Sequence, residues 1–269
     1  MTTLLLRLAG PMQSWGTQSQ HTDRDTGMEP SKSGVIGLFC AALGMSRDDD
    51  TVSYRGSVIT LAELAILPMA VRVEREGAMG KDYHTVGGTH LRVDKMRGYG
   101  VAKANGNRAE PVVSQRFYLA DADFLVGLEG KMDLLAHLHA ALQAPCWQLS
   151  LGRKSFVPAL PVHVPDDPTH YGPALRAAPL LDVLNGESWR VRRVNEPVPG
   201  RLRLVYDLDA TGARGADDIA VQARRQDVPI SFAIARREYR TRTVAITTIP
   251  NPSFAEKGGE PDVSLPVAR

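Results

Sequence analysis

Small hydroxyl residues and one lysine stand where a helix is predicted to begin. Ser31, Lys32 and Ser33 follow Pro30 and precede a mostly apolar run that ends at Gly44. The first N–H groups of a helix have no partner within the helix, and the helix dipole is positive at that end. The pattern therefore predicts an anion-binding site. A plain helix N-cap at Ser31 or Ser33 explains the same residues, and both interpretations stay open.

A long basic stretch lies between two predicted strands. Residues 76–114 separate them where a short hairpin loop would suffice. From residue 81 to residue 116 the chain has seven basic and only three acidic residues. The same stretch also contains four aromatic side chains, Tyr83, His84, His90 and Tyr99. Cations neutralise phosphates and flat rings stack on bases, so the stretch favours an arm that grips a polyanion. A solvated loop without a ligand is the alternative.

Lys81, Tyr83 and His84 are the residue types that metal-independent RNA cleavage needs. That chemistry uses a general base for the 2′-hydroxyl, an acid for the leaving oxygen and a cation on the phosphate. Side chains alternate along a strand, so near neighbours do not guarantee one compact site. The remaining Asp and His residues lack the spacing of metal ligands, so we expect no metal and no cofactor.

The elements that must position these residues follow a β-α-β-β-α-β order. Apolar periodicity predicts strands at residues 3–9, 67–73, 118–128 and 148–151, and helices at 31–43 and 131–143. This is the order of a split βαβ, or ferredoxin-like, unit, and it occupies residues 1–160. The region 161–269 is predicted to be smaller and mostly β, with strands at 201–208, 230–235 and 236–249 and an extended tail from about residue 250.

The composition is that of a soluble globular protein. The chain has 269 residues, of which 43% are hydrophobic and 23% charged. Its net charge of +2 does not by itself indicate a nucleic-acid binder. Cys40 and Cys146 form neither a zinc pattern nor a disulfide framework, so we expect a reducing, cytoplasmic location. No signal peptide or membrane span is expected.

Six short motifs occur together in one order. They are residues 10–16 (GPMQSWG), 24 and 26 (Arg and Thr), 30–38 (PSKSGVIGL), 81–86 (KDYHTV), 118–122 (YLADA) and 151–155 (LGRKS). In this order they resemble the CasD-type subunit of the type I-E CRISPR surveillance complex, Cascade. That subunit belongs to the fifth Cas family, within the RAMP superfamily. The resemblance covers about residues 1–160 and is diffuse beyond them.

The resemblance implies an α+β fold in which a ferredoxin-like (RAMP, RRM-like) domain carries a long β-hairpin thumb at about residues 77–115. It also implies an RNA-binding function in antiviral defence. Such subunits cap one end of the complex and hold the 5′ handle of the CRISPR RNA (crRNA). Expected partners are the crRNA, the backbone RAMP subunit and the large PAM-recognising subunit. Target DNA is reached indirectly through the complex, and no membrane is involved.

Within this resemblance we expect RNA contacts from several segments. Trp15 would stack on a splayed handle base that Gln13 and Ser14 help to hold, and Lys32, Ser33 and Arg24 would bind phosphates. The remaining candidates are Lys81, Tyr83, His84, Arg92, Lys95, Arg108, Arg153 and Lys154. A structural role remains possible for each group: a core Trp with turn caps, a helix N-cap, a loop ion pair or a solvated turn.

We expect no catalytic activity. In the subtype that the chain resembles, a separate subunit processes the precursor RNA. The alternative is a metal-independent endoribonuclease that processes precursor CRISPR RNA through Lys81, Tyr83 and His84.

Overall fold

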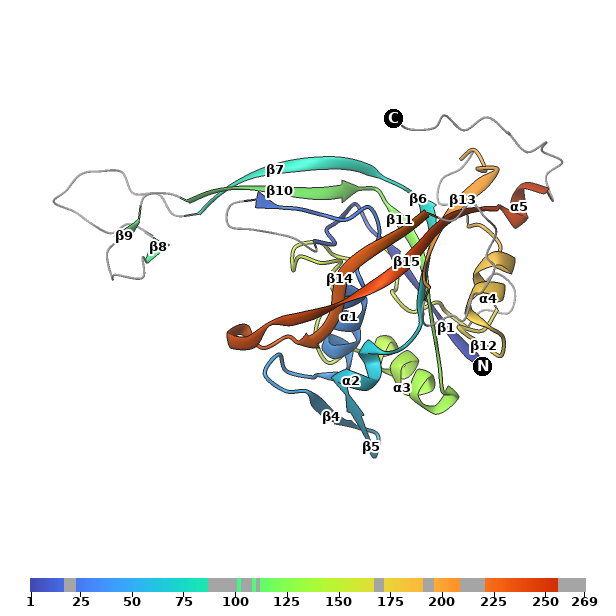
Figure 1. Ribbon diagram of the computed structural model, residues 1–269, viewed down its shortest axis with the longest axis horizontal. Helices are drawn as coiled ribbons and strands as arrows, with labels where there is room; N and C mark the ends of the chain where they lie inside the picture. The colour runs from blue at the N-terminus through green and yellow to red at the C-terminus, as the bar shows by residue number, and fades with distance from the viewer. Residues whose placement is uncertain are drawn as a thin grey trace.

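A seven-stranded sheet forms the centre of the molecule (Figure 1). The computed structural model describes residues 1–16, 23–86, 101–102, 108–109, 112–166, 172–190, 196–208 and 221–255. All neighbouring strands of this sheet are antiparallel. In sheet order they are β12 (Leu175–Arg176), β1 (Thr2–Ala9), β11 (Asp123–Gly130), β6 (Met69–Arg75), β13 (Arg201–Asp207), β15 (Glu238–Pro250) and β14 (Val221–Ser231).

Helices cover both faces of this sheet. Figure 1 places α1 (Lys32–Leu43), α2 (Leu61–Ala65) and α3 (Met132–Gln143) on one side and α4 (Leu180–Gly186) on the other. The approach of α4 is close, because a Cβ added at Gly127 of β11 would lie 2.5 Å from Leu180 Cδ1. All eight residues of β1 are consequently buried.

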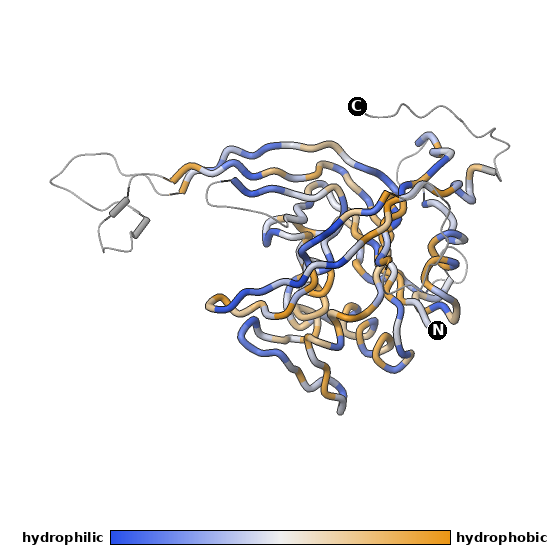
Figure 2. The backbone as a smooth tube through the Cα atoms, viewed as in Figure 1, coloured by the Kyte–Doolittle hydropathy of each residue, from blue (hydrophilic) through white to orange (hydrophobic). Residues whose placement is uncertain are grey.

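A smaller, four-stranded sheet carries a hairpin that projects from the body (Figure 1). Its strands are β2 (Met12–Gln13), β10 (Val112–Ala120), β3 (Asp23–Arg24) and β7 (Ala78–Val86), and β7 pairs with β10 along its whole length. Figure 2 shows hydrophobic residues at the outer end of this hairpin, where Val86, Val112 and Val113 are between 36% and 43% exposed.

The remaining elements are short. They are β4 (Thr51–Tyr54), β5 (Ser57–Thr60), β8 (Val101–Ala102), β9 (Arg108–Ala109), the 3₁₀-helix η1 (Ile234–Arg236) and α5 (Pro252–Ala255).

The first helix has the boundaries that its sequence predicts. Ser31 is the N-cap, and its hydroxyl accepts a hydrogen bond from the N–H of Gly34 at 3.3 Å. Gly44 ends the helix with a φ of 78°, a left-handed conformation that glycine adopts without strain. A Cβ at Gly34 would lie 2.8 Å from the ring of Trp15, so packing against an indole explains this helical glycine.

Three strand predictions are wrong. The single strand expected at residues 118–128 divides at Asp121, whose φ of 57° separates β10 from β11. Residues 148–151 form no strand, and β12 pairs with β1 at the corresponding edge instead. The strand expected at 230–235 lies earlier, as β14, because the polar residues Arg224, Arg225 and Asp227 masked its apolar pattern.

The C-terminal region extends the same central sheet. β13 pairs with β6, and β15 and β14 follow it. The chain before and after residue 160 therefore contributes strands to one mixed α/β body with an antiparallel central sheet. The tail predicted from about residue 250 is described only as far as residue 255, which includes α5.

Candidate nucleic-acid interface

The β7–β10 hairpin presents two different faces to solvent. Lys81 and Tyr83 share one face, while Asp82 and His84 point to the other, because side chains alternate along a strand. Tyr83 is 67% exposed, and Lys81 is the register partner of the half-buried Phe117. One face thus combines an amine with two aromatic rings, which suits stacking on bases. His84 lies on the opposite face, so the three residues considered for RNA cleavage do not converge.

Three arginines and one aspartate meet near the middle of the paired strands of this hairpin. Arg116 on β10 is the register partner of Arg24 on β3 and of Asp82 on β7. Arg153 comes from a distant turn, and its Nη2 donates to the carbonyl oxygen of Phe117 at 2.8 Å. Burial lowers the pKa of Arg153, the charges of Arg116 and Arg24 lower it further, and Asp82 opposes them. We call these four residues the arginine cluster.

The arginine cluster carries more positive than negative charge. Like charges on neighbouring strands repel each other, and an anion between them would relieve the repulsion. Arg24 is exposed, and Arg116 and Arg153 are half-buried, so solvent reaches all three side chains. Guanidinium groups bind phosphate through paired, charge-assisted hydrogen bonds. The cluster therefore has the charge and donor chemistry of a site for a phosphodiester backbone.

The residues expected to read a base form their hydrogen bonds with other atoms of the protein. Gln13 is fully buried, and its amide donates to the carbonyl oxygens of Leu8 at 3.0 Å and Ala122 at 2.8 Å. It also accepts from the indole N–H of Trp15, which is 1% exposed. Ser14 is buried as well, and its hydroxyl lies 3.3 Å from the carbonyl oxygen of Phe117. These contacts fix the loop before α1 and leave no ring face or amide edge for a base.

The start of α1 does bind an anion, and that anion is a carboxylate of the protein. The N–H of Lys32 donates to Asp227 Oδ2 at 2.8 Å, and its Nζ donates to Asp207 Oδ2 at 2.9 Å. Arg242 pairs with both aspartates. Burial lowers the pKa of Lys32, and its attraction to Asp207 opposes the shift. We call these four residues the buried ion cluster; it occupies the place predicted for a phosphate.

The other candidates are dispersed. Ser33 is half-buried with its Oγ 3.4 Å from that of Ser31, and Lys154 is exposed beside Arg153. Arg92 and Lys95 lie outside the described residues, and of Arg108 only the backbone, in β9, is described.

Sequence reasoning missed Arg116 as a site residue, although it counted its charge. The missing information was the pairing of β10 with both β3 and β7, which brings Arg116 to the centre of the cluster. Its Nε also donates to Ser114 Oγ at 3.1 Å, so the side chain is held in place. The motif around Arg24 and the turn at Arg153 were the two signals that the sequence did provide.

Comparison with known proteins identifies the family. A family model described as CRISPR-associated protein (Cas_Cas5) matches residues 3–245. The chain belongs to the Cas5 family. This Cas5 chain is 35% identical over 163 residues to the CRISPR system Cascade subunit CasD of Escherichia coli strain K12. That match covers 56% of the chain and 65% of the relative, slightly less than two thirds of its length.

Two solved structures resemble the whole Cas5 chain. One is a chain of a CRISPR RNA-guided surveillance complex, with a TM-score of 0.69, 34% identity and coverage of 92% of this chain and 91% of that one. The other is a crystal structure of a Cas protein, with a TM-score of 0.62, 33% identity and coverage of 93% and 95%. The resemblance inferred from the six motifs is confirmed.

The described residues form neither a membrane span nor a metal-binding group. No helix among them is long and apolar enough to cross a membrane. No group of three or more His, Cys, Asp or Glu residues in the same part of the chain is arranged to hold a metal ion.

Proposed function

We propose that this Cas5-family chain is an RNA-binding subunit of a Cascade-type CRISPR complex. In this proposal it holds the 5′ handle of the crRNA, caps one end of the complex and does not cut RNA. The observation that carries the proposal is the arginine cluster, in which Arg24, Arg116 and Arg153 come from three separate segments to one hairpin.

The hairpin adds a second contact to this proposal. Lys81 and Tyr83 flank Asp82 along β7 and point to the opposite face of the hairpin, so a strand of RNA that is held at the arginines and crosses the hairpin would meet a cation and a ring on that face. His84 is exposed on the face that also carries Asp82, and Lys154 is exposed beside Arg153. Gln13, Ser14, Trp15 and Lys32 act as supports that shape the loop and helix behind it.

The sheet order supports a ferredoxin-like arrangement for the first part of the chain. In that arrangement the strands β1, β6 and β11 lie with β11 in the centre, and the fourth strand pairs with β1. The order β12-β1-β11-β6 is compatible with it if β12 serves as the fourth strand. We further propose a cytoplasmic location, with the backbone RAMP subunit and the large PAM-recognising subunit as partners and target DNA reached through the complex.

The absence of catalysis is part of the proposal. RNA cleavage without a metal needs an acid, a base and a cation around one phosphate. Lys81 and Tyr83 share a face that His84 does not, and this separation argues against that geometry on β7. Incubation with labelled precursor CRISPR RNA tests this part: specific cleavage that is abolished by His84→Ala would contradict it.

Binding of a repeat-derived RNA with the 5′ handle tests the RNA-gripping role. Fluorescence anisotropy at several salt concentrations gives both the affinity and its salt dependence. We expect Arg116→Gln to lower affinity about 10- to 100-fold, since charge-assisted hydrogen bonds contribute about 1.5–3 kcal/mol. The slope of log K against log salt should become shallower by about one unit, which corresponds to the loss of one phosphate contact.

A matched control separates the cluster from general basicity. Arg47 is exposed in the loop after α1, and Arg47→Gln removes the same charge away from the hairpin. It should leave the affinity within about two-fold of the parent. Equal losses in both variants, or no RNA binding by the parent chain, would overturn the proposal.

A further inference from the structure

Both legs of the hairpin leave the central sheet through left-handed residues. Gly77, with a φ of 74°, joins β6 to β7, and Asp121, with a φ of 57°, joins β10 to β11. The two junctions touch, because a Cβ added at Gly77 would lie 2.7 Å from the carbonyl oxygen of Ala120. The two legs therefore turn out of the central sheet side by side, and beyond this turn β10 also pairs with β2 and β3.

Arg75 bridges these two legs. Its Nη1 donates to Asp121 Oδ2 at 2.6 Å, and its Nη2 pairs with Glu196. Arg75 ends β6, Asp121 follows β10, and Glu196 lies in the segment that leads to β13. One guanidinium thus joins both legs of the hairpin to the C-terminal region.

Arg203 of β13 holds the first leg from another side. Its Nε and Nη2 donate to the two carboxylate oxygens of Glu76 at 2.8 and 2.7 Å, a bidentate pair. Its Nη1 donates to Glu29 Oε2 at 2.9 Å, and Glu29 also accepts from Arg225. Glu29 lies in the loop between β3 and α1, so Arg203 connects the hairpin to the loop that follows Arg24.

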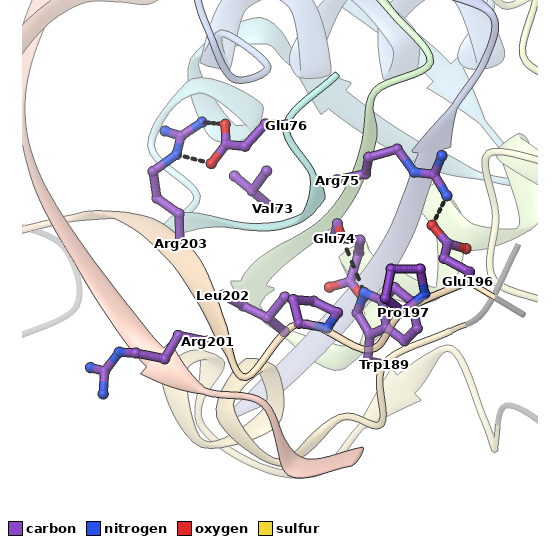
Figure 3. A pocket seen from close by; sticks show the side chains of 11 residues that line it. Val73, Glu74, Arg75, Glu76, Trp189, Glu196, Pro197, Arg201, Leu202 and Arg203 are labelled. Atoms are coloured by element: carbon purple, nitrogen blue, oxygen red, sulfur yellow. Dashed lines mark hydrogen bonds and ion pairs between the residues drawn. The ribbon is translucent and has the colours of Figure 1, made fainter. Parts of the chain in front are cut away.

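An open groove lies between these two sets of ion pairs. Figure 3 shows the Arg203–Glu76 pair on one side of it and the Arg75–Glu196 pair on the other, with Trp189, Pro197 and Leu202 below. The groove has a volume of about 270 Å³. Apolar packing therefore does not fill the space beside the first leg, and the ion pairs fix its direction there.

We propose that Arg75 and Arg203 are positioning residues that set the angle between the hairpin and the central sheet. Nine residues of strand span about 30 Å, so a tilt of about 10° would move the outer end of β7 by about 5 Å. Through Arg203 and Glu196, the C-terminal region controls where the hairpin, with Lys81, Tyr83 and Arg116, lies relative to the body of the protein. The consequence for RNA binding rests on the proposed RNA-binding function; the control of the angle does not.

Distance measurement by pulsed electron paramagnetic resonance tests the angle directly. Spin labels at Thr85→Cys on β7 and Asp133→Cys on α3 report the distance between the hairpin and the body of the protein. Both sites are exposed. Cys146, which is exposed, is first changed to Ser. Cys40 stays, because burial raises the pKa of its thiol to about 12 and keeps it unreactive.

We expect a narrow distance distribution in the parent and a broadened or shifted one in Glu76→Gln and in Arg75→Gln, with an unchanged melting temperature. Asp121→Asn offers a further variant, because Asn also tolerates the left-handed conformation. The control Asp50→Asn removes the exposed Asp50–Arg236 pair away from the hairpin and should change nothing. An unchanged distribution in Glu76→Gln and Arg75→Gln would overturn the proposal.

RNA titration of the same variants tests the functional consequence. We expect Glu76→Gln to lower affinity about three- to ten-fold with the salt slope unchanged, because the number of phosphate contacts stays the same. Altered distances with unchanged affinity would overturn control of RNA binding through the angle. A parent chain that binds no handle RNA would overturn the proposed function, while the distances would still decide the role of Arg75 and Arg203.

Discussion

Two charge clusters of similar composition have opposite surroundings in this chain. The buried ion cluster joins Lys32 and Arg242 to two aspartates inside the protein. The arginine cluster gathers three arginines with Asp82 at a partly exposed surface. The first has equal numbers of positive and negative groups, whereas the second has an excess of positive charge.

This difference separates a structural role from a binding role. A buried charge must be paired, because desolvation without a partner is expensive. The pairs at Lys32 are complete without a ligand, so they join α1 to β13, β14 and β15. A surface cluster with unbalanced charge remains able to attract a phosphate. The residue types alone did not distinguish the two clusters; their charge balance and exposure do.

The largest effect should come from breaking the buried ion cluster. Asp227→Ala removes both hydrogen bonds to Arg242, at 2.7 and 2.9 Å, and the contact at the start of α1. It leaves a buried guanidinium short of a partner, and we expect a loss of about 3–5 kcal/mol in the free energy of unfolding. The melting temperature should fall by about 10 °C in calorimetry. Asp50→Asn, which breaks the exposed pair with Arg236, is the comparison variant. An equally small fall in melting temperature in both variants would show that the buried ion cluster is not needed for folding.

A smaller loss should follow from removal of the helix cap. Ser31→Ala deletes the hydroxyl that accepts from Gly34, and we expect a cost of about 1 kcal/mol in stability. RNA affinity should not change, because the start of α1 already holds Asp227. Denaturant unfolding and RNA anisotropy on the same sample measure both. Weaker RNA binding with unchanged stability would restore the helix start as an RNA site.

The smallest effect should come from adjusting the charge balance of the arginine cluster. Asp82→Asn keeps the shape of the side chain and removes the only carboxylate of the arginine cluster. RNA affinity should therefore rise about two- to five-fold at low salt. The gain should shrink as salt is raised, because the site is partly exposed. Asp48→Asn, in the exposed loop after α1, is the matched control. A decrease in affinity would mean that Asp82 itself contacts RNA.

Local patterns predicted the elements well where contacts within one segment decide them. The helix cap at Ser31 and the stop at Gly44 are examples, and the leucines of β1 are another. The roles of charged residues were harder, because their partners are distant in sequence. Lys32 pairs with Asp207, 175 residues away, and no local pattern indicates that contact.

The same limit applies to the candidate site. Trp15 and Gln13 have the residue types of a base-binding pair, and their burial depends on contacts with Gly34 and Ala122. Arg116 looks like one of several scattered charges until β10 is paired with β3. The hairpin expected at the basic insertion is present as the paired strands β7 and β10, and its RNA contacts stay a prediction.

A structure of the chain bound to handle RNA tests the central claim most directly. The distances to measure are those from RNA phosphate oxygens to the guanidinium nitrogens of Arg24, Arg116 and Arg153. We predict at least one phosphate at about 2.7–2.9 Å from two of these arginines, with Lys32 still paired to Asp207. RNA bound elsewhere on the chain, or a phosphate at the start of α1 in place of Asp227, would contradict the claim.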